Sequence, residues 1–259
     1  MASLKLEAHL LQLLENERAV RAFLDRSARV WSWRLDLQGG EILFLEQGTG
    51  RILFSSAVKL IGTEDQQART FLFSWNDPEF HEDWGAMSGL GRLRVAARDE
   101  GLSVFDEQVA FPLDSSVHAL AWALAATGFL NAFLVFEAKE AARVQYVAVE
   151  QFPDAKLLHR EAQGALELIK NATQRFSFAH RVALEAYLGK PTGAGATTLT
   201  QETLFWQING TELRAVLDHK GQLLDIALEL KATPEPTPEL EAAPEPKRGF
   251  LERFFGKRR

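Results

Sequence analysis

Short runs of strand-forming residues, separated by glycine-containing turns, constrain the fold of this chain more than any other feature. Gly39-Gly40 and Gly48-Thr49-Gly50 supply the first turns, and Asn209-Gly210 is the strongest hairpin signal in the sequence. Turns this short join neighbouring strands that run in opposite directions. The pattern therefore predicts antiparallel sheets. The expected strands cover residues 30–37, 41–47, 51–61, 70–75, 132–138, 143–151, 202–208, 212–218 and 222–230.

Segments with helical character alternate with these strands. Asn76-Asp77-Pro78 combines a capping side chain with a proline suited to a first turn, and so predicts that a helix starts there. That helix is expected to break near Gly89, and the last helical zone near Phe176–Phe178. The chain is thus predicted to be α+β, with mostly antiparallel sheets and packed helices. The expected helices cover residues 3–29, 79–100, 116–128 and 155–188.

One apolar stretch requires a membrane test. No residue between Asp114 and Glu137 is formally charged, and the run 117–136 approaches the length that spans a bilayer. Gly128 and Asn131 interrupt it, however, and suit a helix end followed by a turn. The stretch is therefore predicted to be a buried helix that runs into a buried strand, and no transmembrane segment is expected.

The start of the chain does not resemble a secretory signal. Residues 1–29 contain Glu7, Glu15 and Glu17 where a signal peptide has an uninterrupted apolar region. We therefore expect a cytoplasmic protein, with peripheral attachment to the membrane as an alternative discussed below.

Composition changes abruptly at Ala232. Residues 232–248 hold five of the nine prolines and four glutamates, and almost nothing apolar, as in an extended linker that cannot form a core. Four parts are predicted: an α+β domain over 1–153, a helical segment with a three-stranded meander packed with it over 154–231, a disordered linker over 232–248, and a basic amphipathic tail over 249–259.

The tail has a composition unlike the rest of the chain. Lys247–Arg259 carries six basic residues and one acid, so the net charge of −6 averages a strongly acidic remainder with a cationic end. In a helix, its four apolar residues would share one face. The tail is predicted to bind either an anionic membrane surface or a groove on a partner protein. The alternative is a solubilising tail that folds back onto the acidic body. The predicted binding residues are Phe250, Leu251, Arg253, Phe254, Phe255, Lys257, Arg258 and Arg259.

Composition and motifs exclude several kinds of chemistry. The chain has no cysteine, which removes disulfides, thiolate nucleophiles and cysteine-ligated metals. His81 lies beside Glu82 and Asp83, but Gly85 stands where a zinc-binding helix needs its second histidine. The glycines of 85–91 and 190–195 lack the Gly-Lys-Ser/Thr order of a phosphate loop.

No catalytic set follows from spacing either. The histidines of the helical zones have no serine and aspartate partners that spacing alone can select. We therefore predict no catalytic, cofactor-binding or metal-binding residues. General nucleic-acid binding is not expected, because the chain as a whole is acidic. The histidines weighed in this way are His118, His159 and His180.

Parts of residues 24–150 resemble an uncharacterised bacterial family, a domain of unknown function. The resemblance begins with a Trp-x-Trp strand, Trp31 and Trp33, and ends with an aromatic strand, Phe71-Leu72-Phe73-Ser74-Trp75-Asn76. The family more often has a second tryptophan where Phe73 stands. The resemblance implies a shared α+β fold and no activity. Between the two ends, it includes Phe44, Ile52, Phe54 and Gly62-Thr63.

The sequence favours a non-enzymatic cytoplasmic binding or adaptor protein whose flexible tail docks on a membrane surface or a partner. The alternative is an enzyme or small-molecule-binding protein with a pocket between the sheet and the helices after Trp75. The tryptophans Trp31, Trp33 and Trp75 would either pack in the core or line such a pocket.

Overall fold

The structure, a computed structural model, describes residues 5–102, 105, 110–113, 116–153, 161–195, 198 and 200–229. These residues belong to one compact unit, Met1–Glu229. The predicted division into 1–153 and 154–231 stays a prediction. The linker over 232–248 and the tail over 249–259 lie outside the described residues.

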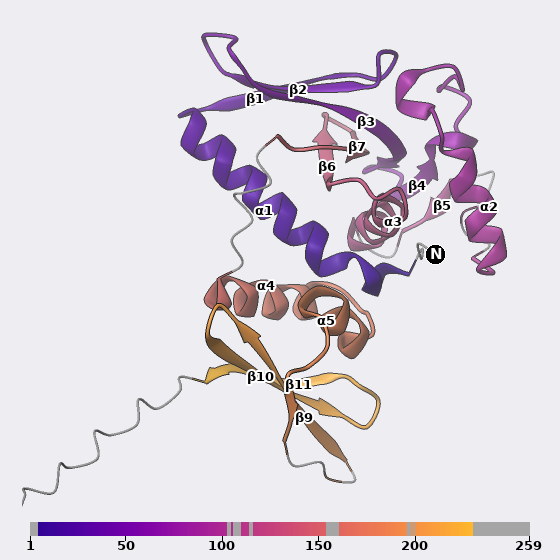
Figure 1. The fold of residues 1–259 in the computed structure, drawn as a ribbon. Coiled ribbons are helices and arrows are strands. Elements are labelled where there is room, and N and C mark those ends of the chain that lie inside the picture. The colour runs from indigo at the N-terminus through magenta and orange to yellow at the C-terminus, as the bar shows by residue number, and fades with distance from the viewer. Residues whose placement is uncertain are drawn as a thin grey trace, which may run out of the picture. The chain divides into compact units, whose positions relative to one another are not determined.

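The first sheet is antiparallel throughout. Its strands are β1 (Trp31–Asp36), β2 (Glu41–Glu46), β3 (Ile52–Asp65), β4 (Thr70–Phe73), β5 (Phe111–Pro112), β6 (Leu134–Lys139) and β7 (Arg143–Val149). The first five lie in sequence order, β7 pairs with β3, and β6 pairs with β7 (Figure 1). β3 is the strand that links β1 and β2 to the rest of the sheet, because its start pairs with β2 and its end pairs with β4 and β7.

The second sheet is a meander in the order β11-β10-β9-β8. Its strands are β8 (Gly193–Ala194), β9 (Gln201–Ile208), β10 (Thr211–Asp218) and β11 (Leu223–Glu229). Asn209 and Gly210 have φ angles of 48° and 83°, as the predicted two-residue hairpin turn requires. Antiparallel sheets and packed helices together confirm the predicted α+β class.

Helices cover both sheets. The first sheet carries α1 (Leu10–Ser27), preceded by the 3₁₀ turn η1 (Leu6–Ala8), and α3 (Ser116–Phe129). The second sheet packs against α4 (Ala162–Arg175) and α5 (His180–Leu188), which lie between it and α1 (Figure 1). The break between α4 and α5 confirms the interruption expected near Phe176–Phe178.

The helix predicted to begin at Asn76-Asp77-Pro78 does not form. Residues 74–76 and 85–87 are the short 3₁₀ turns η2 (Ser74–Asn76) and η3 (Gly85–Met87), and α2 begins only at Gly91 and ends at Asp99. Tertiary hydrogen bonds compete with helical ones here. Gly85 N donates to Gln38 O at 2.8 Å and Ala86 N to Leu37 O at 3.2 Å, which ties the segment to the β1–β2 turn.

The apolar stretch 117–136 behaves as predicted. α3 ends at Phe129, and β6 begins at Leu134. The turn between them is a Schellman motif, in which Asn131 has a φ of 56°, Ala132 N donates to Thr127 O, and Asn131 N donates to Gly128 O. Among the described residues, no helix is both long enough and apolar enough to cross a membrane.

Aromatic packing fills the core of the first sheet. Phe44 stacks on Phe54 with ring centroids 4.4 Å apart. The ring of Trp31 is tilted against that of Phe44, with centroids 6.0 Å apart. Trp75 stacks on Phe73 at 4.6 Å, and its Nε1 donates to Phe105 O at 3.0 Å. Trp31, Trp33 and Trp75 all pack against the core, as the core-packing alternative expects.

Two polar contacts join α5 and the residue before it to α1 and to η1. The side chains of Glu15 and Tyr187 are 6 % and 5 % exposed, and the tyrosine hydroxyl donates to Glu15 Oε1 at 2.8 Å. Ala179 N, at the start of α5, donates to Glu7 Oε1 at 3.3 Å. The helical hairpin is therefore fastened to the first helix by specific polar contacts as well as by apolar packing.

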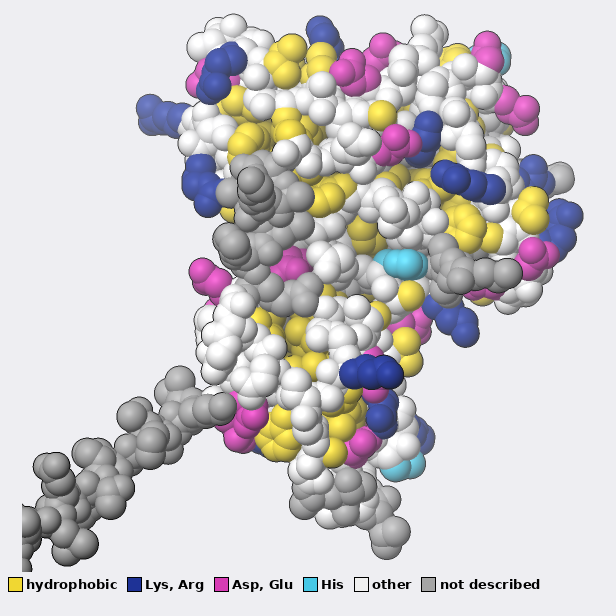
Figure 2. All heavy atoms as spheres, viewed as in Figure 1, with side chains coloured by type: hydrophobic (Ala, Val, Ile, Leu, Met, Phe, Trp, Pro, Cys, Tyr) yellow, Lys and Arg dark blue, Asp and Glu magenta, His cyan; other side chains and the backbone are white. Residues whose placement is uncertain are grey.

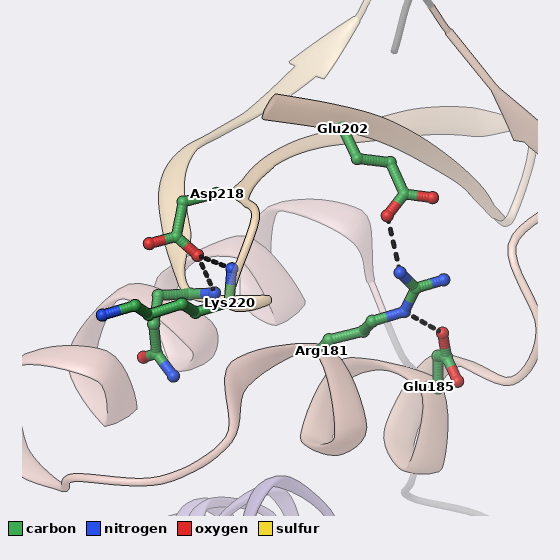
Figure 3. A network of polar contacts seen from close by, with 6 residues as sticks. Arg181, Glu185, Glu202, Asp218 and Lys220 are labelled. Carbon is green, nitrogen blue, oxygen red and sulfur yellow. Dashed lines mark hydrogen bonds and ion pairs between the residues drawn. The ribbon is translucent and has the colours of Figure 1, made fainter. Parts of the chain in front are cut away.

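A polar network fastens α5 to the meander (Figure 3). Arg181 points from α5 toward β9 and donates to Glu202 at 2.6 Å and to Glu185 at 2.9 Å. Asp218 Oδ1 accepts from the backbone N–H groups of Lys220 and Gln222, both at 2.8 Å, and so closes the β10–β11 turn. Arg181 N also donates to Gly221 O at 3.1 Å, so both the backbone and the side chain of Arg181 link α5 to the meander.

Candidate functional site

A polar cleft lies where the start of α1, the turn after α3 and the end of β7 meet. It consists of two adjacent cavities of about 410 and 240 Å³, which share Asn131, Ala132 and Glu150 in their linings. Together they fall in the size range of pockets that hold small molecules, about 300–1,000 Å³. We call these two cavities the polar cleft. Its polar side chains are His9, Gln12, Asn16, Lys59, Arg92, Asn131, Glu150 and Gln151.

One wall of the polar cleft depends on a close approach between helices. A Cβ at position 128 would overlap the Cβ and the ring of His9, so the residue that precedes α1 comes this near to α3 only because residue 128 is glycine. Gln12 and Asn16, four residues apart, lie on one face of α1, and His9 is the residue that precedes this helix. The glycine thus brings a polar stripe of α1 against the end of α3.

Hydrogen bonds hold the amides of this stripe in place. Gln12 Nε2 donates to Asn16 Oδ1 at 2.8 Å, and Asn16 Nδ2 donates to Phe133 O at 2.6 Å. Phe133 N in turn donates to Val149 O at 2.7 Å, at the end of β7. These hydrogen bonds join α1 to Phe133, the residue before β6, and to the end of β7.

The charged groups of the polar cleft are partly paired with one another. Lys59 Nζ lies 3.6 Å from Glu150 Oε1 and donates to Gly85 O at 3.1 Å. The lysine side chain is 17 % exposed and the glutamate 37 %, so solvent screens the pair and it adds little to stability. Arg92, in the first turn of α2, brings a further positive charge to the second cavity.

The lining of the polar cleft mixes hydrogen-bonding and charged side chains. Side-chain amides supply both donors and acceptors, and one lysine–glutamate pair with one arginine gives charge without a strong excess of either sign. Such a lining matches a small polar ligand that both donates and accepts hydrogen bonds.

The structure does not test the site residues that the sequence predicts in the tail. The tail residues Phe250 to Arg259 lie outside the described part of the chain. His81 lies in the turn region between η2 and η3, with its ring 5.5 Å from that of Trp84. Across the described residues, no three His, Cys, Asp or Glu side chains come together as a metal site would require.

Of the three histidines considered as general bases, His180 is the one whose side chain the structure describes. His180 Nδ1 accepts a hydrogen bond from Leu223 N at 2.8 Å, and burial lowers the pKa of its imidazole, with Asp218 opposing that shift. Neutral His180 therefore acts as an acceptor that holds β11. The side chain of His118 and all of His159 lie outside the described residues.

Sequence reasoning missed the residues of the polar cleft. One signal was present, because His9, Gln12 and Asn16 place polar side chains among the leucines at the start of α1. In a single sequence, such a pattern cannot be distinguished from a solvated helix face. Lys59, Asn131 and Glu150 come from distant segments and carry no local pattern.

On the face of the molecule that Figure 2 shows, the described side chains form no cluster of like charge that would suggest a second binding site. Basic and acidic side chains are interspersed over the described part of that face, and no continuous basic track forms there. A nucleic-acid backbone needs clustered positive charge. The expectation of no general nucleic-acid binding stays a prediction.

The chain is therefore an α+β protein with a polar cleft beside its first sheet. A model of the family described as "Family of unknown function (DUF6882)" matches residues 5–152, and the chain belongs to that family. This confirms the resemblance to a domain of unknown function. All the polar side chains of the cleft fall within the matched range. No curated protein and no solved structure matches the chain.

Proposed function

We propose that this protein is a non-enzymatic binding or adaptor protein whose body recognises a small polar ligand in the polar cleft. The observation that carries this proposal is the lining of amides, Gln12, Asn16, Asn131 and Gln151, around cavities of about 410 and 240 Å³. The alternative of a pocket between sheet and helices thus becomes part of the binding function. The polar cleft includes Arg92 of α2 and Asn131 just after α3, and both of these helices follow Trp75 in the sequence.

Thermal unfolding with a ligand panel tests this part. The panel contains glucose, N-acetylglucosamine, uridine, glutamine and citrate, which span neutral and charged polar chemistry. A ligand at a hundred times its Kd stabilises the folded state by about 2.7 kcal/mol. For a protein of this size, that raises Tm by roughly 5–10 °C.

Matched variants locate the ligand. Gln12→Leu and Gln151→Leu remove amides from the polar cleft, whereas Gln174→Leu makes the same change on the exposed face of α4. We expect both cleft variants to reduce the Tm rise and the control to keep it. A Tm rise that persists unchanged in both cleft variants would place the ligand elsewhere and contradict the proposal.

The tail gives the second part of the proposal. We propose that residues 249–259 attach this cytoplasmic protein to an anionic membrane surface or to a protein partner. The support is the sequence alone, in which the apolar residues of the tail share a helical face beside a cluster of basic residues. Each basic group is worth about 1 kcal/mol near an anionic surface, so weak and reversible attachment is expected.

Co-sedimentation with vesicles containing phosphatidylserine distinguishes attachment to a membrane from attachment to a protein partner. The full chain is compared with a chain truncated after Arg248 and with Phe250→Ser/Phe254→Ser/Phe255→Ser, which keeps every charge. Sedimentation of the full chain alone supports membrane attachment. Equal sedimentation of all three chains would remove the membrane role and leave a protein partner.

A further inference from the structure

A shallow groove runs between α1 and α4, on the opposite side of α1 from the polar stripe. Its volume is about 210 Å³, and its lining comes from the middle of α1 and the second half of α4. We call it the α1–α4 groove. It shares no lining residue with the polar cleft, so the two are separate features.

The floor of the α1–α4 groove is apolar. Leu168, Ala172 and Phe176 are 8 %, 2 % and 5 % exposed, and Leu14 packs beside them from α1. An apolar floor flanked by two helices accommodates an inserted side chain and excludes water from it.

The rim of the α1–α4 groove is basic. Arg18, Arg21 and Arg175 stand on it with a single acid, Glu17, which already pairs with Arg21 at 2.9 Å. Arg18 Nη1 donates to Gly164 O at 3.0 Å, and the guanidinium of Arg175 lies 5.2 Å from the ring centre of Phe176. Each guanidinium has five N–H donors, and these contacts use few of them.

The volume of the α1–α4 groove limits the kind of ligand that it can hold. A volume of about 210 Å³ lies below the range of about 300–1,000 Å³ that whole small-molecule ligands occupy. It suits the single aromatic or leucine anchor of a longer ligand, with the rest lying across the rim. The guanidinium groups on that rim favour carboxylates on both sides of the anchor, because arginine binds them through charge-assisted and often bidentate hydrogen bonds.

We propose that the α1–α4 groove binds an acidic peptide segment of a partner protein, with one large apolar side chain on the floor and flanking carboxylates on the arginine rim. This interaction surface is independent of the polar cleft and of the tail. It gives the body of an adaptor protein a docking site of its own, built jointly by α1 and by α4, which lies beyond the range of the family match.

Fluorescence anisotropy with the full chain tests the proposal. The probe is a fluorescein-labelled heptapeptide with one phenylalanine between two pairs of glutamates, and its comparator has glutamine in place of each glutamate. Losing one charge-assisted contact weakens binding about tenfold or more. We therefore expect the comparator, and the variant Arg18→Glu/Arg175→Glu, to bind at least about tenfold more weakly than the wild-type pair.

Two further variants keep the test specific. Arg26→Glu/Arg29→Glu makes the same change in net charge at exposed positions at the end of α1, outside the groove, and should keep the wild-type Kd. Asn171→Trp places a bulky side chain on the exposed rim without changing charge, and should weaken binding even if the charge-reversed variant fails to fold.

Several results would overturn the proposal. Equal weakening by both charge reversals would show non-specific attraction to positive charge. Equal affinity for the glutamate and glutamine peptides would remove the role of the rim. No binding at about 1 mM protein, or binding of octanoate in the groove without binding of the peptide, would reject a peptide as the occupant.

Discussion

Replacing Gly128 with alanine tests the close approach that forms the wall of the polar cleft. In an isolated helix, this change would favour folding by about 1 kcal/mol, because alanine is the better helix former. Here the new Cβ would overlap the Cβ and ring of His9. The overlap involves atoms close to the His9 backbone, so rotation of the side chain cannot relieve it.

Comparing the gain from helix propensity with the cost of the overlap gives the sign of the change in the free energy of unfolding. Forcing extra volume into a packed contact costs about 1–3 kcal/mol, and a contact near the backbone lies toward the upper end of that range. The net result expected for Gly128→Ala is a loss of about 1–2 kcal/mol in the free energy of unfolding. Combining it with His9→Gly removes the obstacle, so in that background the alanine should stabilise by up to about 1 kcal/mol.

The wild type, Gly128→Ala, His9→Gly and the double variant form a double-mutant cycle. Urea unfolding followed by circular dichroism at 222 nm measures the free energy of unfolding of all four proteins. The expected coupling between positions 9 and 128 is about 2–3 kcal/mol. Gly91→Ala is the control, because a Cβ at position 91 meets no atom within 4 Å. If Gly128→Ala stabilises the protein equally with and without the His9 side chain, the reasoning about this contact is wrong.

Three further predictions concern how the helices and the meander are held. Tyr187→Phe leaves the buried Glu15 carboxylate without its hydroxyl partner and should cost about 1–3 kcal/mol in urea unfolding, whereas adding Glu15→Leu should recover part of that loss. The pKa of His180 in the folded protein lies below its ordinary value, so unfolding takes up a proton at low pH, and the free energy of unfolding should fall as pH drops below about 6.5. The variant His180→Gln should lose this pH dependence in unfolding curves recorded from pH 8 to pH 5. Leu213→Ala removes a fully buried side chain from β10 and should lower the free energy of unfolding by about 2–5 kcal/mol, and a loss below 1 kcal/mol would mean that the meander contributes little to the core.

Local chemistry made most of the secondary structure predictable. The Asn209-Gly210 turn needs two positive φ angles, and these residue types adopt them at low cost, so the hairpin can be inferred from two adjacent residues. The end of α3 is similar, because Asn131 takes the left-handed conformation that a Schellman motif requires. In each case the decisive interactions span only a few residues.

The false helix start at Asn76-Asp77-Pro78 shows where local chemistry fails. The side chain of Asp77 does accept from Glu79 N at 3.0 Å, as a capping residue would. The chain nevertheless continues as turns, because Gly85 and Ala86 donate hydrogen bonds to the β1–β2 turn. Backbone groups that find partners in another element gain nothing from helix formation, and the sequence carries no local sign of such partners.

The sequence by itself determined the α+β class, the antiparallel hairpins and the charge contrast between the body and the tail, since each depends on neighbouring residues or on composition. Only the tertiary structure decided where the polar cleft and the α1–α4 groove lie. The polar cleft joins Gln12 of α1, Asn131 after α3 and Glu150 after β7, and the α1–α4 groove joins Arg18 to Arg175. Such sites depend on contacts between segments more than a hundred residues apart, and those contacts follow from how the whole core packs.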